Sequence, residues 1–175
     1  MAYRALFAAA ALTLTPLAIA PAAFAQAPES VYTKKNVAVG GYDPVAYFTV
    51  GEATKGDDSF TSTYNGAEYR FSSADNKATF DANPAAYLPE YGGYCAWAVA
   101  QGKTAPGNGK HWAIVDGKLY LNYNGGVQKK WNADRDGFIA SADEKFPVLF
   151  PATPRGQGSD ARPTQSQSGG QGYGS

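Results

Sequence analysis

Two dipeptides, Asn65-Gly66 and Asp116-Gly117, constrain the fold of this chain more than any other feature. Each lies between segments rich in aromatic and β-branched residues, the pattern that surrounds a two-residue type I′ turn. Both central positions of such a turn need positive φ, which Asn, Asp and Gly adopt more readily than other residues. We therefore expect one β-hairpin over residues 60–71 and a second over residues 111–123.

A short helix is predicted directly after the first hairpin. Ser72 or Ser73 can cap its N-terminus, and the helix is expected to run to about Ala82. Ala78 and Phe80 are expected on its buried side. The segment therefore adds one helix to the first hairpin.

The last helical region is predicted to begin after Gly125-Gly126, with Trp131 on its apolar side. Pro147 is expected beyond its end, because proline does not fit a helix interior. Residues 134–137 resemble a turn and can divide the region in two. Antiparallel hairpins packed against short helices place the chain in the α+β class, as a single domain over residues 30–150.

The first 25 residues have the composition of a cleaved secretory signal. Arg4 precedes an apolar run from Ala5 to Ala20, and Ala23-Phe24-Ala25 has the small-x-small pattern of a cleavage site. A retained membrane anchor is the alternative interpretation. Cleavage near Ala25 predicts a periplasmic or secreted protein, with no membrane contact afterwards.

Residues 151–175 are composed mainly of Pro, Gly, Ser, Gln and Thr. Such a segment buries too little apolar surface to offset the entropy lost on ordering, so we predict a disordered tail. The chain has 15 basic and 15 acidic residues and shows no basic stripe, which argues against a nucleic-acid partner. A single cysteine excludes an intramolecular disulfide.

Several segments together resemble the YHS domain, in its stand-alone exported bacterial form. The matching positions are Gly41-Tyr42-Asp43-Pro44-Val45-Ala46-Tyr47-Phe48, Tyr64 to Ser73, Asn76, Phe80, Asn83-Pro84 and Tyr87. The resemblance covers residues 39–88 well. From Tyr91-Gly92-Gly93-Tyr94-Cys95-Ala96 onward the chain looks like the extended form of this family. The resemblance implies a small α+β module.

Metal-associated members of that family, as the resemblance implies, carry cysteine at three positions that here are Ala46, Ser72 and Asn76. A thiolate cluster needs sulfur donors at fixed spacing. The family's metal ligands are therefore not carried over to this chain.

Cys95 and His111, the single cysteine and single histidine, are the residues best suited to chemistry. Three interpretations remain open for them. Cys95 can be an inert residue of the core, since it lies in an apolar, helix-like run. The pair can also bind one copper or zinc ion, with Asp43, Tyr91 or Tyr94 as a further ligand. A thiolate nucleophile with His111 as its base is the third.

The leading functional hypothesis is an exported binding or accessory module without catalytic activity. We expect its aromatic-lined site to combine residues from four segments, namely Asp43, Tyr91, Tyr94, Cys95, His111 and Asn122. The expected partner is a small molecule or a metal ion. A copper- or zinc-handling protein and a thiol-dependent enzyme are the alternatives.

Overall fold

The computed structural model describes residues 29–151. The predicted signal segment and residues 152–175 of the predicted tail lie outside this range. No helix between residues 29 and 151 combines the length and apolar character that crossing a membrane requires.

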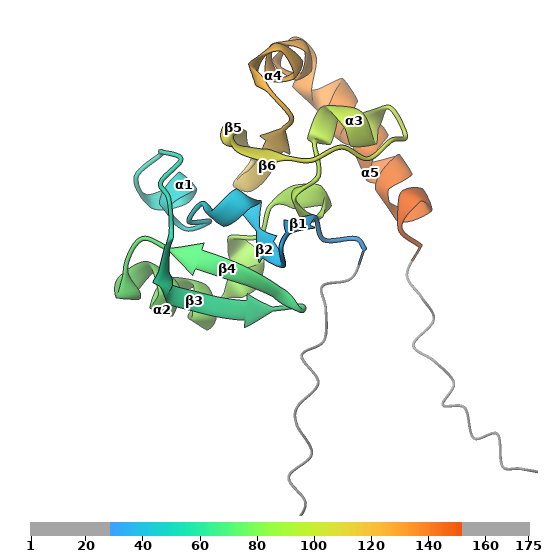
Figure 1. Cartoon of the computed structure of the whole chain (residues 1–175). Helices are drawn as coiled ribbons and strands as arrows, with labels where there is room; N and C mark the ends of the chain where they lie inside the picture. Colours follow the sequence, from blue (N-terminus) through green and yellow to red (C-terminus); the bar gives the residue numbers. More distant parts are fainter. Residues whose placement is uncertain (1–28, 152–175) are drawn as a thin grey trace, which may run out of the picture.

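The described chain alternates short strands and short helices (Figure 1). Its strands are β1 (Thr33–Lys34), β2 (Val37–Ala38), β3 (Asp57–Tyr64), β4 (Ala67–Phe71), β5 (Asn108–Val115) and β6 (Lys118–Asn122). Its α-helices are α1 (Ala46–Thr49), α2 (Ala74–Ala82), α3 (Ala96–Ala100), α4 (Gly125–Asn132) and α5 (Arg135–Leu149). Three short 3-10 helices are η1 (Val39–Gly41), η2 (Pro84–Ala86) and η3 (Glu90–Gly93).

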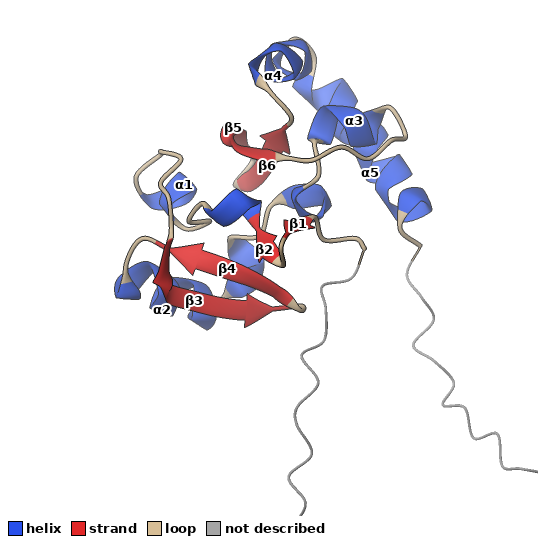
Figure 2. Ribbon diagram, viewed as in Figure 1, coloured by secondary structure: helices blue, strands red, loops and turns tan. Residues whose placement is uncertain are grey.

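The strands form two small sheets, which confirms the α+β class. One sheet has four strands in the order β1-β2-β4-β3, and the other is the β5-β6 hairpin. Figure 2 shows the four-stranded sheet with α2 in the lower half of the view and the β5-β6 hairpin with α3, α4 and α5 in the upper half. Segment η1 links β2 to the turn that leads into α1.

Both predicted hairpin turns are confirmed. Asn65 and Gly66 have φ values of 47° and 75°, and Asp116 and Gly117 have values of 50° and 72°. The strands begin earlier than expected, at Asp57 and at Asn108, and both pairings contain a register shift near that start. The turn chemistry therefore fixes where each hairpin closes.

Helix α2 is confirmed, with Ser73 as its N-cap: the Ser73 hydroxyl oxygen accepts a hydrogen bond of 3.1 Å from the Asn76 amide. Phe80 is buried as expected, but the expectation for Ala78 is wrong, because Ala78 is exposed. Two residues subtend about 200° on a helix, so Ala78 and Phe80 face nearly opposite directions. The helix buries only a narrow stripe.

The C-terminal helical region is divided as expected, between α4 and α5, where Asp134 caps α5 by accepting from the Gly137 amide. The expectation for Pro147 is wrong, because it lies inside α5. In the last turn of a helix a proline removes only one backbone hydrogen bond. The Phe150 amide still donates to the Phe146 carbonyl at 3.0 Å, so the helix continues past the proline.

Strand β6 separates two apolar clusters and contributes to both. Leu119 and Leu121 pack against the four-stranded sheet and Phe80, whereas Tyr120 faces Trp131 and the helices α3 to α5. Leu119, Leu121 and Tyr120 are all at most 2% exposed. Consecutive strand residues point to opposite faces, so a single buried strand joins the two halves of the core.

Candidate functional site

The structure leaves Cys95 and His111 on opposite sides of β6. Cys95 pairs with Leu121 along one edge of β6, and its Sγ lies 3.8 Å from the Asn122 side-chain oxygen. His111 belongs to β5, which pairs along the other edge. Its imidazole lies beside Gly125, where an added Cβ would be 3.6 Å from the ring. Two strand spacings amount to about 10 Å, so the backbones of the two residues lie well apart.

Cys95 is 1% exposed and lies at the start of α3, among small apolar residues. We expected the Cys95 sulfur to contact the His111 imidazole. No such contact is found among the described residues. The Cys95 sulfur contacts the side chain of Asn122, another residue of the predicted site. This environment favours the interpretation of Cys95 as a small residue of the core.

Tyr91 and Tyr94, also predicted for the site, hold other elements in place. The Tyr91 hydroxyl donates to an Asp143 carboxylate oxygen at 2.9 Å, and burial, then this hydrogen bond, raises the pKa of the phenol. The Tyr94 hydroxyl donates to the Glu29 carbonyl at 2.6 Å, and its ring stacks on Phe150 with 5.1 Å between centroids. Tyr94 therefore binds both ends of the described chain.

Asp43 is fully buried and occupies the centre of a hydrogen-bond cluster. Its carboxylate accepts from the backbone amides of Val45 (2.9 Å), Ala46 (3.2 Å) and Ser72 (2.8 Å), and from the side chains of Ser72 (2.7 Å) and Asn76 (2.7 Å). Five donors share two oxygens, so the carboxylate is well satisfied. Asp43 joins the turn before α1 to the end of β4.

The three positions compared with the cysteine ligands of the YHS family, Ala46, Ser72 and Asn76, all donate hydrogen bonds to Asp43. They converge in space as a metal-ligand set would, but here they surround a carboxylate. Between residues 29 and 151 there is no group of three or more His, Cys, Asp and Glu side chains arranged for a metal ion.

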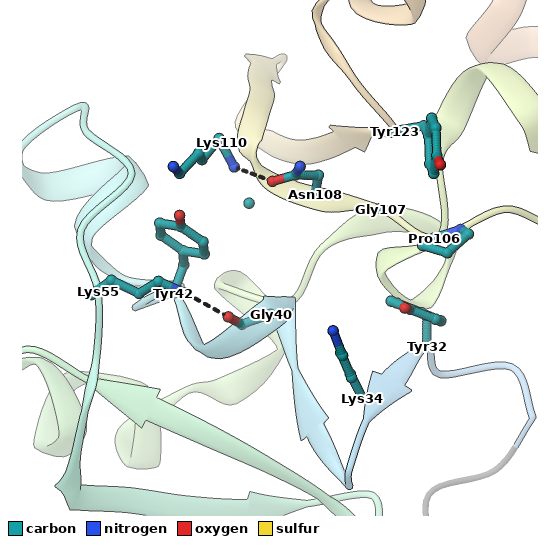
Figure 3. A pocket seen from close by; sticks show the side chains of 11 residues that line it. Tyr32, Lys34, Gly40, Tyr42, Lys55, Pro106, Gly107, Asn108, Lys110 and Tyr123 are labelled. Atoms are coloured by element: carbon teal, nitrogen blue, oxygen red, sulfur yellow. Dashed lines mark hydrogen bonds between the residues drawn. The ribbon is translucent and has the colours of Figure 1, made fainter.

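A cleft that sequence analysis did not predict lies between η1 and the first residues of β5 (Figure 3). We call it the tyrosine-lysine cleft. It has a volume of about 390 Å³, and its lining consists of tyrosines, lysines and a glycine-rich segment: Tyr32, Lys34, Gly40, Tyr42, Lys55, Pro106, Gly107, Asn108, Gly109, Lys110 and Tyr123.

Gly107 and Gly109 of the cleft pack closely against neighbouring segments. A Cβ on Gly109 would lie 2.4 Å from the Tyr42 ring, and a Cβ on Gly107 would lie 2.1 Å from the Gly93 carbonyl oxygen. Only glycine leaves room for such contacts. The Tyr47 hydroxyl also donates to the Gly109 carbonyl at 2.8 Å, which fixes the start of β5 beside Tyr42. The cleft is thus preformed.

The charge of the cleft is positive. Lys34, Lys55 and Lys110 line it, and neither Asp nor Glu is found among its lining residues in the described chain. The Lys55 ammonium donates to the Gly40 carbonyl at 2.8 Å and lies 3.8 Å from the centroid of the Tyr42 ring. This arrangement concentrates positive charge in a chain whose formal net charge is zero.

The Lys55 side chain is largely exposed, but partial burial of its ammonium lowers its pKa below the usual lysine value of 10.5, and repulsion from Lys110 and Arg70 lowers it further. Between the folded-state pKa and 10.5, the unfolded chain binds more protons than the folded chain. Over that pH window the contribution of Lys55 to the free energy of unfolding rises with pH. At pH values below the folded-state pKa, Lys55 is charged in the folded chain and destabilises it by the full amount.

Removing the charge of Lys110 should therefore raise the pKa of Lys55. We expect Lys110→Gln to move the Lys55 value toward 10.5 without reaching it, since burial remains the larger cause. A pH titration of the lysine side-chain carbons by NMR measures the change. Lys129→Gln, which removes an exposed lysine of α4, is the matched control. If the pKa of Lys55 were the same in the wild type and in both variants, this explanation would be wrong.

No family model, curated protein or solved structure matches this chain. The resemblance to the YHS family therefore stays a prediction, and a functional assignment has to depend on the geometry of the cleft.

Proposed function

We propose that this protein is a binding module without catalytic activity, exported from the cell, whose tyrosine-lysine cleft binds a small organic anion. The observation that carries the proposal is the convergence of three lysines and three tyrosines on one opening free of acidic lining residues in the described range. The proposed binding site is therefore this cleft and not the site predicted around Cys95 and His111.

The chemistry of the lining suits an anion with a flat apolar part. Lys34, Lys55 and Lys110 supply positive charge, while Tyr32, Tyr123 and Pro106 gather at one end of the cleft (Figure 3). Tyrosine rings offer apolar faces for stacking. A volume of about 390 Å³ lies within the range of small-molecule sites.

The charge pattern also favours a ligand energetically. Lys110 and Arg70 each repel the Lys55 ammonium and, after burial, contribute to its lowered pKa. A bound anion would relieve that repulsion. Since the lysines are largely exposed, the attraction should be weakened by salt.

The test is an NMR titration of the protein with benzoate as the probe, at low and at high ionic strength. We expect shift changes at residues of the cleft, with weaker binding at high salt. Lys110→Gln should weaken binding by about 3- to 10-fold, the effect of roughly 1 kcal/mol from one partly screened charge.

Lys129→Gln removes the same charge outside the cleft and should leave the affinity unchanged. Shift changes that avoid the cleft, or equal affinities for wild type and Lys110→Gln, would refute the proposal.

A further inference from the structure

A second opening adjoins the tyrosine-lysine cleft. It has a volume of about 400 Å³ and is lined by basic and small residues: Lys34, Lys35, Val37, Gly40, Gly41, Lys55, Gly56 and Arg70. Lys34, Gly40 and Lys55 line both openings. The two openings are therefore neighbours with these three residues between them, and we refer to the pair as the groove.

The groove collects an unusual share of the positive charge. Its two parts are lined by five basic residues, Lys34, Lys35, Lys55, Lys110 and Arg70, out of 15 in the whole chain. No acidic residue of the described chain lines either part. Glu68 lies nearby and pairs with Arg70 through its Nε at 2.7 Å. That contact uses one of the five donors of the guanidinium.

The backbone positions Arg70 firmly at the second opening. A Cβ on Gly56 would lie 2.4 Å from the Arg70 carbonyl carbon, so the chain before β3 lies directly against β4. The Gly56 amide also donates to the Gly41 carbonyl at 3.0 Å, which ties this segment to η1. The second opening is thus lined by three glycines and four cationic residues, together with Val37.

We infer that the ligand is a dianion that spans both openings. One anionic group would lie near Lys110 and Lys55 in the tyrosine-lysine cleft, and the other near Lys35 and Arg70 in the second opening. A single carboxylate cannot lie beside all five cations, since they are distributed over two adjoining openings. Guanidinium groups bind carboxylates and phosphates through paired hydrogen bonds, so Arg70 is suited to bind the anionic group in the second opening.

This inference rests on the proposed function and specifies its ligand class. The experiment compares terephthalate, which has two carboxylates, with its monomethyl ester, which keeps the aromatic ring and has only one. We expect terephthalate to bind at least about 5-fold more tightly at low salt, from roughly 1 kcal/mol contributed by the second charge. The affinities come from NMR titrations.

Lys35→Asn tests the second opening by itself. Lys35 has a φ of 54°, a conformation that Asn tolerates better than other non-glycine residues, so the backbone should be preserved. We expect the variant to lose most of the preference for terephthalate while keeping the affinity for the monomethyl ester. Arg70→Lys, which keeps the charge but not the paired donors, should reduce the preference only in part.

The two proposals fail in different ways. If neither compound shifts residues of the cleft, the proposed function is wrong. If both bind in the cleft with equal affinity, or if Lys35→Asn retains the full preference, the proposed function stands and the inference of a dianion is overturned.

Discussion

Asp43→Ala is expected to lower the free energy of unfolding by at least about 3 kcal/mol, because it leaves several buried donors without an acceptor. Wild-type Asp43 is fully buried and accepts five hydrogen bonds from Val45, Ala46, Ser72 and Asn76. Small domains are stable by only about 5–15 kcal/mol, so the loss would be a large fraction of the total.

Urea unfolding followed by tryptophan fluorescence measures this effect. Asp43→Asn keeps the shape and one acceptor oxygen, and its stability should lie between those of the wild type and Asp43→Ala. Asp75→Ala is the matched control, because Asp75 is an exposed carboxylate on the first turn of α2, and it should change stability by no more than about 0.5 kcal/mol. An unfolding midpoint for Asp43→Ala equal to that of Asp75→Ala would show that the cluster contributes little.

The second large effect is expected at Trp131. This side chain is 0% exposed and packs against Tyr120, with 5.5 Å between the ring centroids, in the cluster under α3 and α5. Trp131→Ala should lower the free energy of unfolding by about 3–5 kcal/mol, through lost burial and the cavity left behind.

Trp131→Phe separates packing from hydrogen bonding. The indole nitrogen of Trp131 is buried and has no hydrogen-bond partner among the described residues. Replacing it with an apolar ring edge therefore removes an unsatisfied donor, which offsets part of the lost volume. Thermal unfolding by circular dichroism should place Trp131→Phe much closer to the wild type than to Trp131→Ala. Similar losses for both variants would contradict this assignment.

The local structure of this protein follows from its sequence where short-range chemistry decides it. Asn65-Gly66 and Asp116-Gly117 adopt the positive φ values that their hairpins need, and Ser73 caps α2, because each depends on only a few neighbouring residues. The errors at Ala78 and Pro147 were also local: residues two apart lie on nearly opposite faces of a helix, and a proline in the last turn removes only one backbone hydrogen bond. The α+β class could be predicted from the order of these hairpin and helix signals along the chain.

The candidate site depends on long-range placement, which the sequence does not display. The tyrosine-lysine cleft is assembled from single residues such as Tyr32, Lys55 and Tyr123, which are far apart in the chain. None of them belongs to a motif. The glycine-rich segment at 106–109 was the one sequence feature that pointed to this cleft. Glycine has no side chain, so a glycine-rich segment indicates that the backbone lies close to another surface.

Cys95 and His111 were predicted to form a site because each is the only residue of its type in the sequence. Which edge of a strand each residue joins is decided by pairing, and β6 lies between them. Strand order of this kind depends on contacts between distant segments. Rare residue types identify possible chemistry but do not determine proximity.

The contacts of Tyr94 bring the two ends of the described domain to one corner, with Glu29 and Phe150 both touching the same side chain. Adjacent ends are the property that allows one domain to be inserted into a loop of another. A host protein could therefore carry this module as an insertion, with its chain leaving and returning at nearly the same point, while the groove lined by Lys34 and Lys55 remained open to solvent.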